Sequence, residues 1–156
     1  MQTLVKTLLI GVLFAVGTGS ASAADAVIGT WQLNVAKSTF SPGPGPKSQT
    51  RTYAEAAHGI ALTIKTTSPD GKESTATLTF TDDGKPSPMS GNPDFDTVSV
   101  TRVSPLKVHS SETKAGVKIG TGIRSVTKDG KTLTFAQKGM HADGTKYDNV
   151  LVYDRQ

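Results

Sequence analysis

The chain has 156 residues, of which 35% are hydrophobic, 6% aromatic and 19% charged, and its formal net charge is +4. This length is typical of a single domain with one hydrophobic core. The absence of cysteine excludes disulfide bonds, thiol catalysis and thiolate metal ligands. The basic residues are scattered and are not interleaved with aromatic residues, so we expect no nucleic-acid binding.

The first 23 residues have the layout of a secretory signal peptide. Lys6 precedes an apolar run at residues 8–16, and small residues follow up to Ala21-Ser22-Ala23. A basic start, a short apolar run and a small-residue cleavage site are typical of an exported precursor. The apolar run is too short for a membrane span, which needs roughly 20 residues. We therefore predict cleavage after Ala23, one domain over residues 24–156, and a periplasmic or secreted product without a membrane span.

Strand patterns and turn signals alternate along the rest of the chain. Asp-Gly pairs at 70–71, 83–84, 129–130 and 143–144 favour tight hairpins, because glycine accepts a positive φ. Between the turns, Thr, Val and Ile alternate with a period of two, which is typical of half-buried strands. These signals predict about nine strands. The expected strands cover residues 28–35, 50–56, 59–68, 73–81, 97–103, 106–113, 117–127, 131–139 and 146–154.

Two long segments rich in Pro and Gly, residues 36–48 and 81–96, interrupt the strand pattern. We expect both to be loops and the first to contain no helix. Loops of this length are usually functional or disordered. Strands joined in sequence by short hairpins favour an all-β fold, an antiparallel up-and-down barrel of about eight to nine strands. A two-sheet β-sandwich shows the same alternation, so the sequence leaves this alternative open.

The two ends of this pattern resemble the calycin barrels, the fold of lipocalins and fatty-acid-binding proteins. Gly29-Thr30-Trp31 places a Gly-x-Trp motif on the first strand, and Tyr153-Asp154-Arg155 ends the last. The resemblance implies a barrel closed at one end by Trp31, with Arg155 packed on its ring and Arg124 as the second candidate. The chain is also similar to small exported, lipocalin-like bacterial proteins. The matching segments are residues 29–34, 40–44, 129–131 and 153–156.

The carboxylate site of fatty-acid-binding proteins is not reproduced. In that family an Arg two residues before a Tyr on the last strand holds the ligand, and Leu151 occupies this position ahead of Tyr153. Arg102 could replace it, because it shares a strand face with Val98 and Val100. An end-capping or solvent-facing position is nevertheless more usual for an arginine.

We predict that the barrel binds a small apolar molecule. Barrels of about eight strands are either filled by side chains or hold one small ligand, and the few large rings in this chain favour a cavity. The expected ligand-binding residues are Trp31, Tyr53, Arg102, Phe135 and Tyr153. No cofactor is expected.

No catalytic or metal site is expected either, so the prediction is a non-catalytic protein. His58, His109 and His141 lack the spacing of metal ligands, and haem is a remote alternative because only His109 lies in a predicted strand. Asp94 and Asp96 could bind Ca²⁺ or act in acid–base catalysis. A turn around Asn92-Pro93, stabilised by side-chain oxygens, is the more usual role of such residues.

The alternative function is that of an envelope protein-interaction or inhibitor module. It would act through the loops 36–48 and 81–96, because Pro-rich loops lose little conformational entropy when they dock on a partner.

Overall fold

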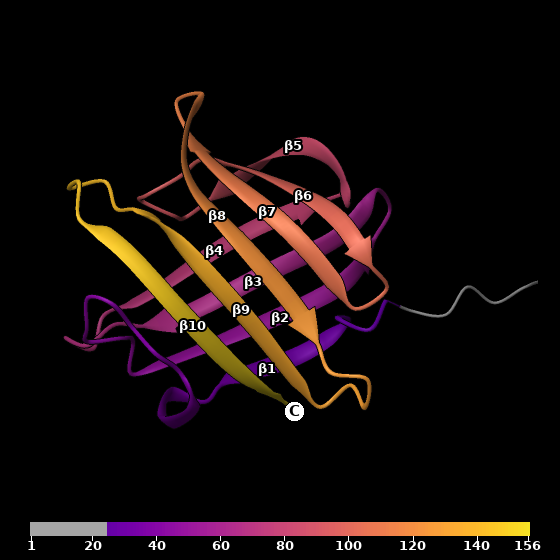
Figure 1. Cartoon of the computed structure of the whole chain (residues 1–156), viewed down its shortest axis with the longest axis horizontal. Helices are drawn as coiled ribbons and strands as arrows, with labels where there is room; N and C mark the ends of the chain where they lie inside the picture. Colours follow the sequence, from indigo (N-terminus) through magenta and orange to yellow (C-terminus); the bar gives the residue numbers. More distant parts are fainter. Residues whose placement is uncertain (1–24) are drawn as a thin grey trace, which may run out of the picture.

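The computed structural model describes residues 25–156, so the predicted signal peptide lies outside the described residues (Figure 1). Ten strands and one short 3-10 helix, η1, form the fold. Their bounds are β1 Gly29–Leu33, η1 Val35–Lys37, β2 Ser48–Ala56, β3 Gly59–Thr67, β4 Glu73–Phe80, β5 Asp83–Ser90, β6 Thr97–Ser104, β7 Lys107–Lys114, β8 Val117–Val126, β9 Thr132–Met140 and β10 Lys146–Arg155.

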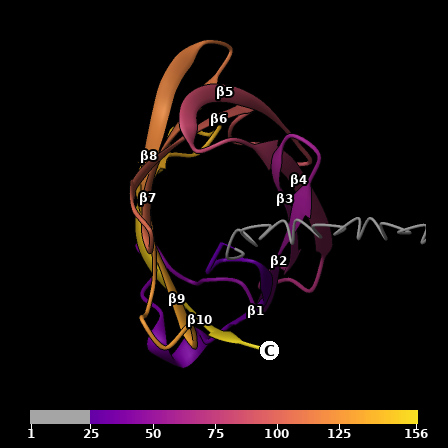
Figure 2. The ribbon, with the colours of Figure 1, turned by 90° about the vertical axis from the view of Figure 1, so that its right-hand side faces the viewer.

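The strands form a closed antiparallel barrel. Each strand pairs with its neighbour in sequence, and β1 also pairs with β10, where Trp31 lies opposite Arg155. Figure 2 shows the resulting ring of strands. The predicted antiparallel up-and-down barrel is confirmed, and the two-sheet sandwich is excluded. The structure has ten strands where the sequence predicted about nine.

The additional strand is β5, so the expected loop over residues 81–96 is wrong in its first half. β5 pairs with β4 only through Thr77 with Ser90 and Leu78 with Met89, and its register with β6 shifts between Asp83 and Pro86. Proline has no amide proton to donate, so it is tolerated only where a strand has sparse ladder hydrogen bonds. Because Pro86 and Pro88 are typical of loops, the sequence pattern did not indicate this strand.

The segment 36–48 differs from its prediction only at its start. Val35–Lys37 forms one 3-10 turn, in which Asn34 Oδ1 accepts a hydrogen bond from the Lys37 amide at 3.1 Å. Asparagine is a favoured residue at this capping position, and it explains a turn that the following Pro and Gly residues obscure. Beyond η1, residues 38–47 contain no helix and are joined to β10 by a bridge between Thr39 and Val150.

The core lies inside the barrel and is densest at one end. The largest fully buried side chains are Trp31, Leu133, Tyr153 and Val27. Val27 precedes β1, so the chain enters the barrel by filling this end, which we call the closed end. Within residues 25–156, the structure contains no helix long and apolar enough to cross a membrane.

Candidate ligand-binding cavity

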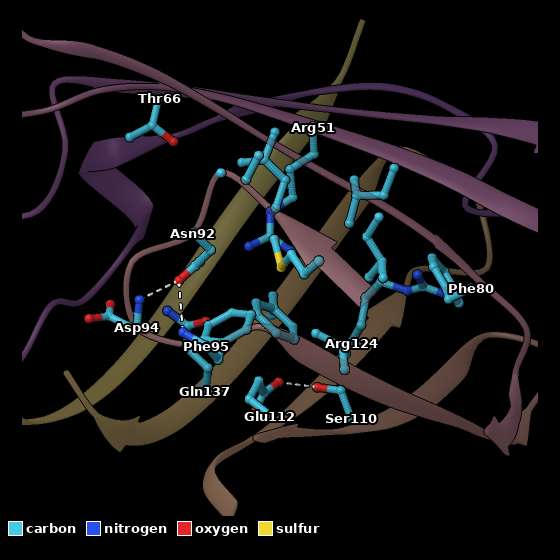
Figure 3. Close-up of a pocket in the computed structure, with 18 of the residues that line it drawn as sticks. Arg51, Thr66, Phe80, Asn92, Asp94, Phe95, Ser110, Glu112, Arg124 and Gln137 are labelled. Atoms are coloured by element: carbon cyan, nitrogen blue, oxygen red, sulfur yellow. Dashed lines mark hydrogen bonds between the residues drawn. The ribbon is translucent and has the colours of Figure 1, made fainter. Parts of the chain in front are cut away.

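Towards the other end, the barrel encloses a cavity of about 210 Å³. Side chains from β2 to β10 line it, together with the segment 91–95 between β5 and β6. Aliphatic residues such as Leu62, Leu78 and Val98 form much of the wall, and Tyr53, Phe80 and Phe135 add aromatic surface. Figure 3 shows polar and apolar side chains around this space. Every second residue of a strand, such as Leu62, Ile64 and Thr66, lines the cavity, because the period-two geometry of strands turns alternate residues inwards.

Two arginines lie inside the barrel and line the cavity. Arg51 on β2 and Arg124 on β8 are each only 7% exposed. None of the ion pairs within residues 25–156 involves either of them. A buried charge without a carboxylate partner is costly, so other groups must stabilise it.

Aromatic rings supply this stabilisation. The guanidinium carbon of Arg51 lies 4.6 Å from the centroid of the Phe135 ring and 5.2 Å from that of Tyr153. For Arg124 the corresponding distances are 5.1 Å to Tyr53 and 5.8 Å to the Phe80 ring. Contacts between a cation and an aromatic face are favourable, and more so when both are desolvated. Of the guanidinium donors, Arg51 Nε donates to Gln49 Oε1 at 3.3 Å. Each guanidinium has five N–H donors, so others can bind an anion.

The lowered pKa of Tyr53 indicates a positive electrostatic potential between these arginines. Burial by itself raises the pKa of the Tyr53 hydroxyl, but the positive charges of Arg51 and Arg124 outweigh burial and lower the pKa below its usual value. Opposite charge near an acidic group favours its ionised form. An anionic group on a ligand would be stabilised in the same place for the same reason.

Glu112 on β7 is the acidic residue buried beside this cavity, and it is 4% exposed. Its Oε1 accepts a hydrogen bond of 2.7 Å from Ser110 Oγ, as Figure 3 shows. Burial raises the pKa of the Glu112 carboxyl above its usual value. The neighbouring Tyr147 hydroxyl has a pKa raised to about 12, because it is buried and because Glu112 and Asp94 are negatively charged.

The segment 91–95 closes over part of the cavity and is fastened to the β9–β10 hairpin. Asn92 Oδ1 accepts hydrogen bonds from the amides of Asp94 and Phe95 at 2.8 and 3.2 Å, so the predicted side-chain-stabilised turn is confirmed. The Asp94 carboxylate lies 2.8 Å from His141 Nδ1 and accepts the Ala142 amide at 2.9 Å. Asp94 therefore holds this segment in place. The segment lies at the end of the barrel opposite the closed end, and we call this end the mouth. No cluster of metal-binding side chains occurs in the described part of the chain.

At the closed end, Arg155 lies on the only tryptophan. Its guanidinium carbon is 4.3 Å from the centroid of the Trp31 ring, and the guanidinium donates to the carbonyl oxygens of Ala26, Ile28 and Gly130. Trp31 is fully buried and donates from Nε1 to the Val27 carbonyl at 2.7 Å.

The structure explains why the first residue of the Gly-x-Trp motif is a glycine. Gly29 has a φ of +134°, and a Cβ at this position would lie 2.5 Å from Arg155 Nη1. A larger residue would therefore be strained in its backbone and would displace the arginine from the indole.

Two of the five predicted ligand-binding residues, Tyr53 and Phe135, line the cavity. Trp31 and Tyr153 lie in the core outside its lining, and the Tyr153 hydroxyl donates to Gln49 Oε1. Arg102 also lies outside the lining, because its guanidinium pairs with Asp25 and Asp82.

Sequence reasoning missed the charged residues of the cavity. Arg124 was considered only as a partner of Trp31, whereas it lies on Tyr53 and Phe80. The available signal was strand alternation: Arg51 is two residues from Tyr53, and Glu112 is four residues from Val108, so each shares a strand face with a buried residue. His109 is exposed on β7 and does not face the cavity, which gives the haem alternative no support.

No protein family model and no curated protein matches the chain. Similar solved structures include zebrafish ileal bile acid-binding protein complexed with cholic acid, with 12% identity and a TM-score of 0.47 over 84% of this chain and 99% of that chain. The redesigned β-barrel mFAP1 bound to DFHBI has 16% identity and a TM-score of 0.46, covering 85% and 98% of the two chains. The siderocalin Ex-FABP has 14% identity and a TM-score of 0.41, covering 84% and 74%.

Proposed function

We propose that this protein is an exported, non-catalytic binding protein, and that its barrel holds one small, largely apolar ligand with an anionic group. The observation that carries the proposal is a partly enclosed apolar cavity with two buried arginines, Arg51 and Arg124, that have no carboxylate partner within residues 25–156. A periplasmic location belongs to the same proposal and is supported by the signal-peptide pattern of residues 1–23.

Cavity size and wall chemistry define the ligand class. A volume of about 210 Å³ lies below the roughly 300–1,000 Å³ of ordinary ligand pockets. This suits a compact molecule rather than a long lipid chain. Burial of its apolar surface stabilises the complex by about 25 cal/mol per Å². A carboxylate adds charge-assisted hydrogen bonds to the guanidinium groups, which are roughly twice as strong as neutral ones.

Calorimetric titration with a carboxylate and its neutral analogue tests the proposal. We expect octanoate to bind more tightly than octanol, and Arg124→Met to reduce octanoate affinity about tenfold or more, because a hydrogen bond to a charged group contributes about 1.5–3 kcal/mol. The matched control is Lys65→Met, which removes one positive charge from an exposed position on β3. Equal affinities for octanoate and octanol, or unchanged octanoate binding by Arg124→Met, would contradict an anion site.

Export is tested separately by mass. Protein recovered from the envelope fraction of its source should lack residues 1–23, and a full-length mass there would contradict cleavage after Ala23.

A further inference from the structure

We propose that the ligand carries a hydroxyl in addition to its anionic group, and that this hydroxyl binds Glu112 and distinguishes the true ligand from plain carboxylates. The inference rests on the proposed function and specifies its ligand class as a small hydroxylated aromatic or alicyclic acid. Three features of the cavity wall support it: an unsatisfied oxygen, two glycines that make room for the carboxyl that carries this oxygen, and the distance between Arg124 and Glu112.

The first feature is Glu112 Oε2. In the described residues it is the one buried side-chain nitrogen or oxygen without a hydrogen-bond partner. Buried polar atoms are almost always paired, and one left unpaired costs stability. Ser110 already binds Oε1 of the same carboxyl, so the pairing is half complete. A ligand group that reached Oε2 would complete it.

The second feature is the space beside this carboxyl. Gly120 on β8 and Gly139 on β9 lie directly opposite each other in the sheet. A Cβ on Gly120 would lie 3.0 Å from both Glu112 Oε2 and the Tyr147 hydroxyl, and one on Gly139 would lie 2.6 Å from the same hydroxyl. The two glycines therefore make room for a carboxyl and a phenol side by side in the barrel wall. Any other residue at these positions would push them into the cavity.

The third feature is the distance between the two polar regions. Arg124 pairs with Val108 across the β7–β8 ladder, and Glu112 lies four residues further along β7. At about 3.4 Å per residue, their backbone levels are about 14 Å apart along the strand. Both side chains are long and line the same cavity. One compact molecule can therefore contact Arg124 with one end and Glu112 with the other.

A hydroxyl fits Glu112 better than a charged group does. It donates to an ionised carboxylate and accepts from a protonated carboxylic acid, so it satisfies Oε2 in either state. An ammonium group would enter a cavity that already holds Arg51 and Arg124, whereas a second carboxylate would be repelled by Glu112. The aromatic side chains of Phe95, Phe135 and Tyr147 in the lining suit a ring between the two polar groups.

The test compares 3-phenylpropanoate with its 3-hydroxy and 4-hydroxy ring analogues, which differ only in one hydroxyl. Calorimetric titration of the mature protein should show that at least one hydroxylated probe binds about tenfold more tightly than the parent. In Glu112→Leu this ratio should fall to about one, whereas Glu112→Gln, which keeps an acceptor and a donor, should retain part of it. Glu55→Gln, an exposed change on β2, should leave the ratio as in the unmodified protein.

The outcomes separate this inference from the proposed function. Tight, Arg124-dependent binding of 3-phenylpropanoate with no gain from either hydroxyl would overturn the inference and leave the anion site intact. A hydroxyl preference that persists in Glu112→Leu would also overturn it, because the group would then bind elsewhere. If none of the three carboxylates binds, the proposed function fails and this inference fails with it. Thermal unfolding of each variant confirms that a lost preference is not a lost fold.

Discussion

Glu112 illustrates how a single buried group links the cavity to stability. Burial raises the pKa of its carboxyl, so the folded protein holds this proton more tightly than the unfolded chain, in which the group ionises near pH 4.5. As the pH rises from this value towards the raised pKa of the folded state, the unfolded state releases the proton first and the free energy of unfolding falls. The loss is complete once the pH exceeds the raised pKa of the folded state.

We therefore expect Glu112→Gln to remove one source of the pH dependence of the free energy of unfolding. The stability of the variant relative to the unmodified protein should increase as the pH rises above the ordinary pKa of 4.5, by about 1.4 kcal/mol for each unit by which the pKa is raised. Urea unfolding at several pH values measures the difference. A constant difference across this range would show that Glu112 has an ordinary pKa in the folded protein.

The three tyrosines should ionise in two separate steps. Tyr147 and Tyr153 are buried, and the pKa of each is raised to about 12, whereas the neighbouring arginines lower that of Tyr53 below 10. Tyrosinate absorbance during an alkaline titration should show an early step from one tyrosine and a late step from two, and Tyr53→Phe should remove the early step. Because Tyr147 and Tyr153 resist ionisation only in the folded state, they reduce stability as the pH rises from about 10 to about 12. A single step near pH 10 for all three would contradict the placement of Tyr53 between Arg51 and Arg124.

At the scale of the strands, the seam between β4 and β5 has the fewest residue pairs in the barrel wall. Its register contains two residue pairs, whereas that between β9 and β10 contains nine. Pro86 and Pro88 further remove two amide donors from β5. Local opening follows the density of such contacts. The amides of β5 should therefore exchange with solvent at least about tenfold faster than those of β9, as measured by hydrogen exchange. Equal protection of β5 and β9 would contradict a weak seam.

The strands also show what the sequence could and could not predict. Nine strands and their up-and-down order followed from alternation and Asp-Gly turns, because hairpin pairing is local. Closure into a barrel rather than a sandwich was left open. β5 was missed because prolines are typical of loops. The neighbouring strands nevertheless hold it in place through sparse pairing. The side-chain-stabilised turn at Asn92 was predictable from residue type, whereas its attachment to His141 was not. That contact joins residues 47 positions apart and depends on barrel closure.

The cavity was only partly predictable for a related reason. Tyr53 and Phe135 were found because aromatic residues on an inward face are expected in a barrel core. Arg51 and Glu112 were passed over because charged residues are usually exposed. Their burial is stabilised by contacts from distant strands, such as that of Phe135 on β9 with Arg51 on β2. These contacts exist only after the sheet has closed.

In the whole molecule, the two ends of the barrel are built from different interactions. At the closed end, Arg155 joins Trp31 to three backbone carbonyls, and Arg102 ties Asp25 to Asp82. At the mouth, the contacts of Asp94 with His141 and Ala142 hold the segment 91–95 in place. Neither Arg155 nor Trp31 lines the cavity, while Asp94 and His141 do. Changes at the two ends should therefore affect different properties.

This division predicts opposite effects for two single substitutions. Arg155→Met should lower the free energy of unfolding by about 1–2 kcal/mol, because it removes a cation–aromatic contact and hydrogen bonds that water partly replaces. It should leave the dissociation rate of a bound carboxylate such as octanoate unchanged. Asp94→Ala should have the reverse effect, with faster association and dissociation and little loss of stability, since it unfastens a segment that covers the cavity. Urea unfolding and stopped-flow binding measure the two properties on the same samples. If Arg155→Met accelerated dissociation as much as Asp94→Ala, the ends would be coupled, and entry of the ligand through the mouth at residues 91–95 would have to be abandoned.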